Sequence, residues 1–260
     1  MISIDPTLIK QMAESGKRLD NRKPDQYREI VIEKNVITSA EGSARVRIGN
    51  TEVVAGVKMD VGDPFSDTPN EGVLMVGAEF LPLASPDFES GPPGEAAIEL
   101  ARVVDRAIRE SKIMDVEKLC IKEGEKVWMV FVDIDILDDD GNLIDAASLA
   151  AIAALSTVKI PKLDENMKVV YGEKGTESLS LKGRALSTTF VKIGNSIFAD
   201  PSLPEFEALD ARLTVGTFNH DGKTMLSSMQ KGGSEGFTLE EIERIMDMAI
   251  KKGDELRALL

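Results

Sequence analysis

Cysteine and histidine are nearly absent from this chain of 260 residues, which has one of each, Cys120 and His220. A single cysteine excludes a disulfide within the chain, and one cysteine with one histidine is too few for a Cys/His zinc site. His220 would be the only base for a Ser-His-Asp triad, but it lies in Asn-His-Asp-Gly, a sequence typical of a hairpin turn. We therefore expect a surface turn at His220 and a buried, unreactive thiol at Cys120, between Leu119 and Ile121.

Long apolar runs and an excess of positive charge are also missing. No stretch approaches the roughly 18 apolar residues of a membrane-spanning helix, and the first residues show neither a basic start nor a cleavable apolar segment. The 31 lysines and arginines are outnumbered by 45 acidic residues, so the formal charge is −14. Nucleic-acid binding would then need a local basic patch or a basic partner. With 42% hydrophobic and 29% charged residues, the chain is predicted to be a globular, cytoplasmic protein without a membrane partner.

Hydrophobic periodicity in the first half of the chain predicts strands followed by helices. A short leading helix is expected over residues 5–15, because Asp5 precedes a proline at the first helical position. Two further helices are expected, over 95–112 and, capped by Asp145, over 146–156. The expected strands span residues 30–37, 44–48, 51–59, 72–83 and 128–136.

The second half repeats this order after a polar connection. Residues 159–176 contain a proline and no clear period, and are predicted to join the two halves. A final helix is expected from Thr238, which forms a capping box with Glu241. The strands expected before it span residues 185–198, 213–218 and 224–230. Together the halves predict an α+β protein with two β-α subdomains, at 28–160 and 184–256.

A row of three arginines follows one face of the helix expected over 95–112: Arg102, Arg106 and Arg109. At roughly 100° per residue they share one stripe opposite the apolar face, which suits contacts with successive phosphates. The alternative is a solvated face whose charge is neutralised by acidic neighbours at pairing distance. Those neighbours are Glu99, Asp105 and Glu110. The loop at 90–94 (Ser-Gly-Pro-Pro-Gly), whose backbone could approach a ligand closely, favours the binding interpretation.

Carboxylates are the other candidates for chemistry. Asp133 and Asp135 point to the same side of their expected strand, where they could hold a divalent cation or share a proton. The simpler interpretation is the solvated face of a half-buried strand. The acidic run 138–140 is expected to be a solvated turn, because it lacks the spaced oxygen ligands of an EF-hand. The glycine-rich segment 232–236 could cradle a phosphate before the last helix, or could be a simple loop.

Several segments resemble the RNase PH-type phosphorolytic exoribonucleases. They are residues 17–22 (Lys-Arg-Leu-Asp-Asn-Arg), 42–46 (Gly-Ser-Ala-Arg-Val), 51–57, 99–106, 139–147 and 209–214. Within that family, the last three segments are similar to the larger, non-catalytic RNase PH-like subunit of the archaeal exosome ring. The resemblance extends over nearly the whole chain. It implies the RNase PH fold (ribosomal protein S5 domain 2-like).

The resemblance also implies partners. A hexameric ring of three heterodimers with a catalytic RNase PH-like subunit would thread single-stranded RNA and shorten it from its 3′ end. Inorganic phosphate would be the co-substrate at the partner's site, and cap subunits with S1 or KH domains would lie on one face. The family's RNA faces the arginine helix, so Arg102 and Arg106 are expected to contact RNA, with Arg109 a weaker third. No cofactor or metal is expected in this chain.

Two departures from the family's pattern indicate that this chain is not itself an enzyme. Active members carry Gly-Gly-Thr-Arg after the central strand, where the arginine holds the attacking phosphate, whereas residues 141–144 are Gly-Asn-Leu-Ile. Active members also have two aspartates, of which alignment keeps Asp210 and replaces the earlier one by Pro204. Placement of the nucleophile and protonation of the leaving oxygen would both fail. We therefore predict a non-catalytic subunit that binds RNA and shapes its partner's active site.

Two other functions stay open at this point. The chain could be a phosphorolytic ribonuclease in its own right, with Asp210, Glu207 or Asp133 replacing the usual pair. It could instead be a scaffold subunit without RNA contact, whose arginines pair only with its own acidic residues. Salt-dependent RNA binding would distinguish an RNA-binding subunit from a scaffold.

Overall fold

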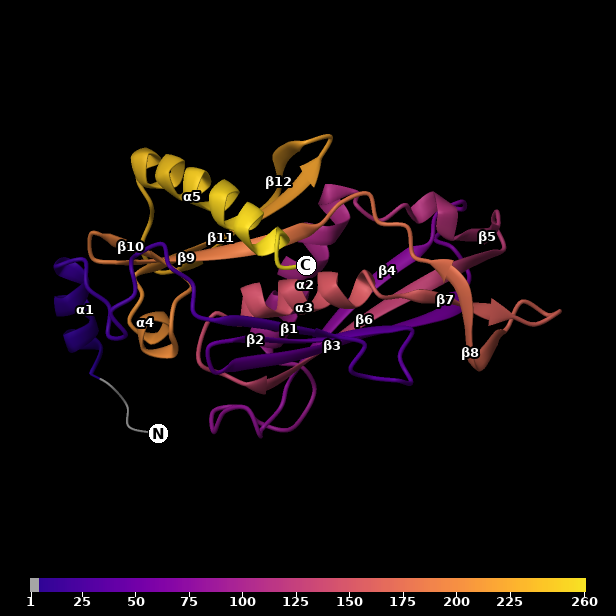
Figure 1. Ribbon diagram of the computed structural model, residues 1–260, viewed down its shortest axis with the longest axis horizontal. Coiled ribbons are helices and arrows are strands. Elements are labelled where there is room, and N and C mark those ends of the chain that lie inside the picture. Colours follow the sequence, from indigo (N-terminus) through magenta and orange to yellow (C-terminus); the bar gives the residue numbers. More distant parts are fainter. Residues whose placement is uncertain (1–4) are drawn as a thin grey trace.

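Two β-sheets enclose a pair of helices, and a third helix covers the outer face of the second sheet (Figure 1). The structure is a computed structural model that describes residues 5–260. For Lys174 it describes the backbone and not the side chain. The layers therefore alternate between sheet and helix. This order brings elements of the first and second halves of the chain into contact.

The first sheet is antiparallel except at one edge. Its strands lie in the order β1-β2-β3-β6-β4, with β4 parallel to β6 and β5 paired to the start of β6. The strands are β1 (Ile30–Lys34), β2 (Gly42–Ile48), β3 (Thr51–Gly62), β4 (Val73–Phe80), β5 (Cys120–Lys122) and β6 (Lys126–Asp138). Burial alternates along β3 and β6, so one face of the sheet packs on the helices and the other is partly solvated.

The second sheet has the order β10-β9-β11-β12 and leaves β12 as an edge strand. Its strands are β9 (Ala185–Ile193), β10 (Ser196–Ala199), β11 (Ala211–His220) and β12 (Lys223–Gly233). Asp221 and Gly222, with φ of 48° and 75°, form the turn between β11 and β12. His220 ends β11 and is exposed, which confirms the predicted surface turn.

α2 (Glu95–Ser111) and α3 (Leu143–Leu155) lie between the two sheets. α3 contacts β2, β3 and β9, while α2 contacts β4 and β12. α3 is buried from Ile144 to Leu155, because its many alanines allow close approach on every side. The other helices are α1 (Pro6–Glu14), η1 (Val116–Leu119), α4 (Leu203–Glu207) and α5 (Leu239–Arg257). None of the helices in residues 5–260 is long and apolar enough to cross a membrane.

The predicted cap of α3 is wrong. The helix begins at Leu143, with Asn142 as its N-cap in the left-handed region (φ 59°). Gly141 also has positive φ, so the chain reverses directly from β6 into the helix. Asp145 therefore lies in the first turn, where its side chain is fully buried and accepts hydrogen bonds from Tyr27 and Thr189.

Other boundaries also differ from the prediction. Residues 159–176, expected to be irregular, instead contribute to a hairpin of β7 (Lys159–Leu163) and β8 (Val169–Ser178). Two shifts of register interrupt this hairpin, which removes the regular alternation by which a strand is recognised. β1 ends at Lys34, before Asn35 takes a positive φ of 60°. Cys120 is only partly buried, contrary to expectation.

Candidate nucleic-acid interface

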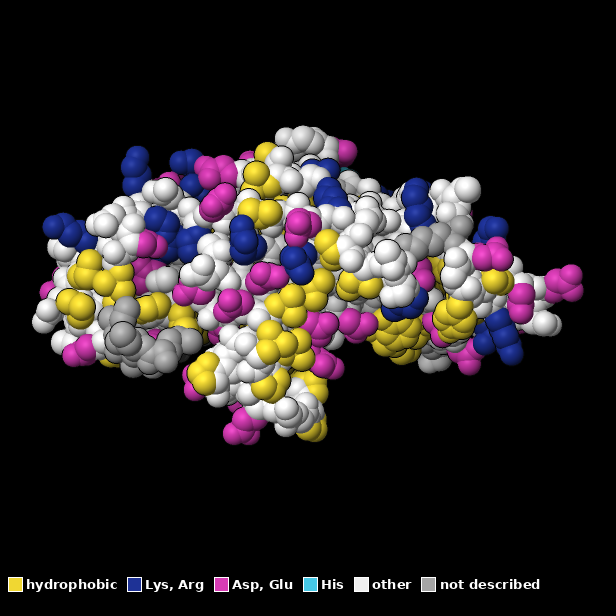
Figure 2. Space-filling view, turned by 60° about the horizontal axis from the view of Figure 1, so that its bottom comes forward, with side chains coloured by type: hydrophobic (Ala, Val, Ile, Leu, Met, Phe, Trp, Pro, Cys, Tyr) yellow, Lys and Arg dark blue, Asp and Glu magenta, His cyan; other side chains and the backbone are white. Residues whose placement is uncertain are grey.

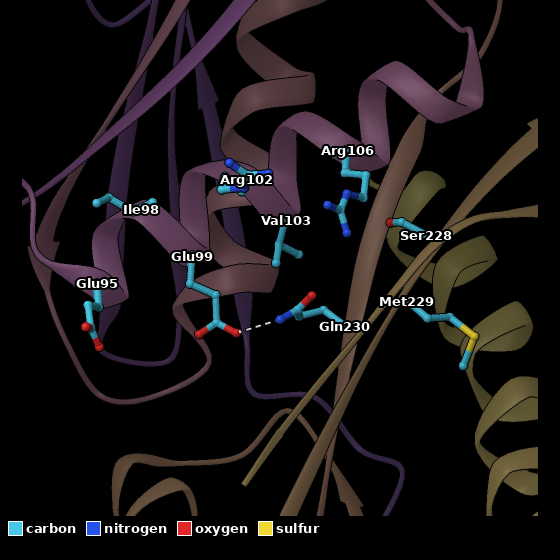
Figure 3. Close-up of a pocket in the computed structure, with 9 residues that line it drawn as sticks. All are labelled: Glu95, Ile98, Glu99, Arg102, Val103, Arg106, Ser228, Met229 and Gln230. Atoms are coloured by element: carbon cyan, nitrogen blue, oxygen red, sulfur yellow. Dashed lines mark hydrogen bonds between the residues drawn. The ribbon is translucent and has the colours of Figure 1, made fainter.

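A groove runs between α2 and the edge strand β12, and we call it the arginine groove (Figure 3). Its volume is about 300 Å³. α2 supplies a whole stripe of side chains, because residues three or four positions apart share one face of a helix. The residues that line the groove are Glu95, Ile98, Glu99, Arg102, Val103, Arg106, Ser228, Met229 and Gln230.

Arg102 and Arg106 are the exposed cations of this groove. Within residues 5–260, neither guanidinium has a hydrogen-bond or salt-bridge partner, and Figure 3 shows Arg106 on the side of Ser228. An unpaired guanidinium presents a planar fork of donors that matches two phosphate oxygens. On the face seen in Figure 2, lysines and arginines lie as separate spots among acidic side chains. Arg102 and Arg106 place two unpaired guanidinium groups on one face of α2, four residues apart.

Arg109, the third arginine of the row, is engaged by its own surroundings. Its Nε and Nη2 donate to the carboxylate of Asp105 at 3.0 and 2.7 Å, and Nη2 also donates to the carbonyl of Leu74 at 2.9 Å. The hydrogen bond to Asp105 raises the pKa of Arg109 further above its usual value. Arg109 is thus neutralised by an acidic neighbour, which is the alternative that the sequence had left open for the whole row.

Glu99 lies in the groove but accepts hydrogen bonds from two residues of the second half of the chain. Arg212 Nη2 and Gln230 Nε2 both donate to its Oε1, the latter at 3.1 Å (Figure 3). Arg212 is itself buried, and its guanidinium carbon lies 5.8 Å from the centroid of the Phe206 ring. Glu99 therefore does not act as a bare anion beside Arg102 and Arg106. Local sequence patterns missed this pairing, because 113 and 131 residues separate Glu99 from its two partners.

A second cavity of about 300 Å³, which we call the α3 cavity, shares Glu99 with the arginine groove. Residues 141–144, at the start of α3, form part of its wall and carry no arginine. The loop before them is fixed by Arg28, whose Nη1 and Nη2 donate to the carbonyls of Asp140 and Gly141 at 2.6 and 3.1 Å. The segment compared with the family's phosphate-binding motif thus faces a mainly apolar space.

Of the carboxylates considered for an independent active site, Asp210 and Asp133 are not brought together. Asp210 precedes β11 and accepts hydrogen bonds from Lys10 Nζ at 2.8 Å and from the amide of Gly194 at 2.7 Å. Although partial burial opposes it, the bond from Lys10 lowers the pKa of Asp210. Asp133 lies in β6 of the other sheet. Asp210 thereby connects α1 to the turn between β9 and β10.

Asp133 and Asp135 share one face of β6, as predicted, with Glu79 of β4 beside them. Partial burial raises the pKa of both aspartates, and the charge of Glu79 adds to the effect. Among the residues that the structure describes, no group of three or more His, Cys, Asp or Glu side chains is arranged to hold a metal ion.

Comparison with known proteins agrees with this architecture. The model of the 3′ exoribonuclease family, domain 1, matches residues 26–161, and that of domain 2 matches residues 183–252. The chain belongs to the 3′ exoribonuclease (RNase PH) family. The family resemblance and the RNase PH fold expected from the sequence are thereby confirmed.

Relatives of this RNase PH-family chain match almost its full length. "Exosome complex component Rrp42" of Methanocella arvoryzae is 51% identical over 252 residues, covering 97% of this chain and 94% of that protein. The protein of the same name from Thermococcus gammatolerans is 48% identical over 254 residues, covering 97% and 92%. A solved structure described as "archaeoglobus fulgidus exosome with RNA bound to the active site" matches with a TM-score of 0.90 and 45% identity, covering 97% of this chain and 96% of that one.

Proposed function

We propose that this chain is a non-catalytic subunit of an archaeal-type exosome, a complex that degrades RNA from the 3′ end by phosphorolysis. It binds single-stranded RNA through Arg102 and Arg106, with Arg109 as a weaker contact, and shapes the active site of a catalytic RNase PH-like partner. The partners are that subunit, in a trimer of heterodimers, and cap subunits with S1 or KH domains. The complex works in the cytoplasm, and phosphate is used at the partner's site.

The observation that carries this proposal is the unpaired state of Arg102 and Arg106 in the arginine groove. Charge placed there without a protein partner is available to phosphates. The non-catalytic role is supported by segment 141–144, which carries no arginine, and by Asp210, whose carboxylate is engaged by Lys10 and by the amide of Gly194. The near full-length relatives named as exosome components support the assembly.

The decisive test measures nucleoside diphosphate release from a 3′-unpaired oligo(A) RNA in phosphate. We expect no release by the purified chain alone and faster release by the catalytic homologue once this chain is added. Phosphate-dependent release by the chain alone would contradict the non-catalytic role.

RNA contact is tested by charge reversal in the assembled complex. Arg106→Glu should weaken RNA affinity about tenfold, because an attraction becomes a repulsion next to the backbone. Arg244→Glu makes the same charge change on the exposed surface of α5, on the other side of the second sheet, and should leave affinity unchanged. Equal effects of the two variants would remove the arginine groove from the RNA-binding surface.

A further inference from the structure

The wall of the arginine groove opposite α2 is polar. It is formed by β12, the edge strand of the second sheet, from which Ser228 and Gln230 line the groove. These residues are two positions apart in a strand, so their side chains lie on the same face. A ligand held by Arg102 and Arg106 therefore lies next to this wall as well.

The side-chain amide of Gln230 has one favourable orientation. Its Nε2 donates to Glu99 Oε1 at 3.1 Å. Reversing the amide would turn its oxygen toward a carboxylate oxygen and place two acceptors against each other. Oε1 is therefore the atom that remains for a ligand, and it is an acceptor.

Glu99 keeps the amide in this orientation because it is itself held in place. Arg212 Nη2 donates to the same carboxylate oxygen, and the Arg212 side chain is only 8% exposed. The guanidinium carbon lies 5.8 Å from the centroid of the Phe206 ring. The backbone of Gly232 is so near that an added Cβ would lie 2.9 Å from Nη2. The acceptor on Gln230 is thus preorganised by contacts that begin at a buried cation.

Gln230 Oε1 is open to the groove. Within the part of the chain that the structure describes, it accepts no hydrogen bond, and the protein does not enclose it fully. Figure 3 shows this oxygen turned toward Val103 and Arg106 of α2 and away from Glu99. The space between Arg106 and Gln230 therefore has a cationic donor on one side and a neutral acceptor on the other.

A phosphate alone does not match both sides of this space. Its oxygens accept hydrogen bonds from Arg106 but would meet a second acceptor at Gln230. The matching ligand carries an anionic oxygen with a hydrogen-bond donor next to it. In a ribonucleotide the 2′-hydroxyl lies beside the 3′-phosphate, and it is both a donor and an acceptor. Deoxyribose has no such donor and makes no hydrogen bond to this oxygen.

We propose that Gln230 Oε1 accepts a hydrogen bond from a ribose 2′-hydroxyl, and that the arginine groove thereby selects ribonucleotides over deoxyribonucleotides. This inference rests on the function proposed above, because it requires RNA phosphates at Arg102 and Arg106. The arginines of α2 provide affinity for the backbone whatever the sugar, whereas β12 provides the distinction between the two sugars.

Binding of three matched oligonucleotides to the assembled complex, without phosphate, tests the proposal. They are oligo(A) RNA, oligo(dA), and 2′-fluoro-oligo(A), which keeps an RNA-like sugar conformation but cannot donate from the 2′ position. Gln230→Met preserves the length of the side chain and removes its oxygen. Affinity for oligo(A) should fall about fivefold relative to affinity for the other two probes, because one hydrogen bond is lost. The catalytic homologue is the same in both complexes, so its own sugar preference cancels from the comparison.

The ratio of affinities separates recognition of the sugar from a structural role of Gln230. Loss of its bond to Glu99 alone would change the affinity for all three probes by the same factor. Gln11→Met makes the same substitution at an exposed position of α1, which packs on α4 and β9, and should leave the ratio unchanged. Thermal melting verifies that both variants retain the fold. An equal loss of affinity for oligo(A) and its 2′-fluoro form in Gln230→Met would assign Gln230 to the base or to the shape of the groove and overturn the proposal.

Arg106→Glu distinguishes failure of this inference from failure of the proposed function. It should weaken binding of all three probes, because each carries the same phosphates. Unchanged affinity of Arg106→Glu for oligo(A) would remove RNA from the groove and overturn both. Weaker binding by Arg106→Glu, together with an unchanged ratio in Gln230→Met, would overturn recognition of the sugar alone.

Discussion

Arg28 and Asp200 form a two-point ion pair, in which Nε and Nη2 donate to Oδ2 and Oδ1 at 3.0 and 2.7 Å. Asp200 is fully buried, and the same guanidinium also reaches the carbonyls of Asp140 and Gly141. One side chain from before the first strand thereby connects the second half of the chain to the loop that precedes α3. The wall of the α3 cavity depends on this connection.

Arg28→Lys should lower the free energy of unfolding by about 2–3 kcal/mol, because lysine keeps the charge but cannot donate from a planar fork to four acceptors. Urea unfolding at neutral pH measures the change. Arg45→Lys is the matched control: Arg45 pairs with Glu33 and Glu52 on the surface, where its side chain is 48% exposed, and exposed pairs contribute less than about 1 kcal/mol. Equal losses at both positions would contradict the role of the fork.

Gly141→Ala should destabilise the protein by more than about 2 kcal/mol. Gly141 has a φ of 84°, and an added Cβ would lie 2.6 Å from the backbone of Ser202 and Leu203 at the start of α4. Gly222→Ala separates the strain of a positive φ from the contact with α4. Gly222 has a φ of 75° but open space around it, so this variant should lower the free energy of unfolding by only about 1 kcal/mol. Thermal or urea unfolding of both variants provides the comparison, and similar losses would show that the contact with α4 is unimportant.

Asp145 should make stability fall as pH rises. Burial raises its pKa from 3.8 to about 6, although Tyr27, Asn142 and Thr189 donate hydrogen bonds to it. The folded state therefore retains a proton that the unfolded state loses, and this group's contribution to the free energy of unfolding declines between about pH 4 and pH 6, by about 2–3 kcal/mol.

Asp145→Asn removes this titration while preserving side-chain shape. The free energy of unfolding of both proteins is measured with urea from pH 4 to pH 7. As pH rises, the wild type should lose stability relative to the variant. The control is Asp5→Asn, because a backbone hydrogen bond from Thr7 lowers the pKa of Asp5. The difference in free energy of unfolding between Asp5→Asn and wild type should therefore stay constant over this pH range. A constant difference for Asp145→Asn as well would show that Asp145 is ionised throughout.

Salt dependence counts the arginines that touch RNA. Each lost phosphate contact on a single strand lowers the slope of log affinity against log salt by about 0.7, so Arg102→Ala/Arg106→Ala should lower it by about 1.4. Arg109→Ala should change the slope by less than the roughly 0.7 of a full phosphate contact, because its guanidinium is held by Asp105 and Leu74. Filter binding of oligo(A) to the assembled complex over a salt series supplies the values, with Arg244→Ala expected to match wild type.

The helical face that carries the arginines and the strand at 224–230 could both be predicted, whereas their position against each other could not. α2 follows a strict 3.6-residue period, so its extent and its stripe were predicted almost to the residue. Its contact with β12 depends on the stacking of two sheets, and no local pattern encodes that. The start of α3 was missed for a different reason: Asn142 takes a left-handed conformation that a side-chain rule for helix caps does not anticipate.

α3 lies between both sheets and has no outward face, since all its residues from Ile144 to Leu155 are buried. A helix that is apolar on every side needs cover from every side. Neither sheet alone could shield it, so the two subdomains are not independent folding units and should melt in one cooperative transition. One alanine-rich helix thus supplies core to both sheets, so a destabilising substitution in either subdomain is expected to lower the melting temperature of both.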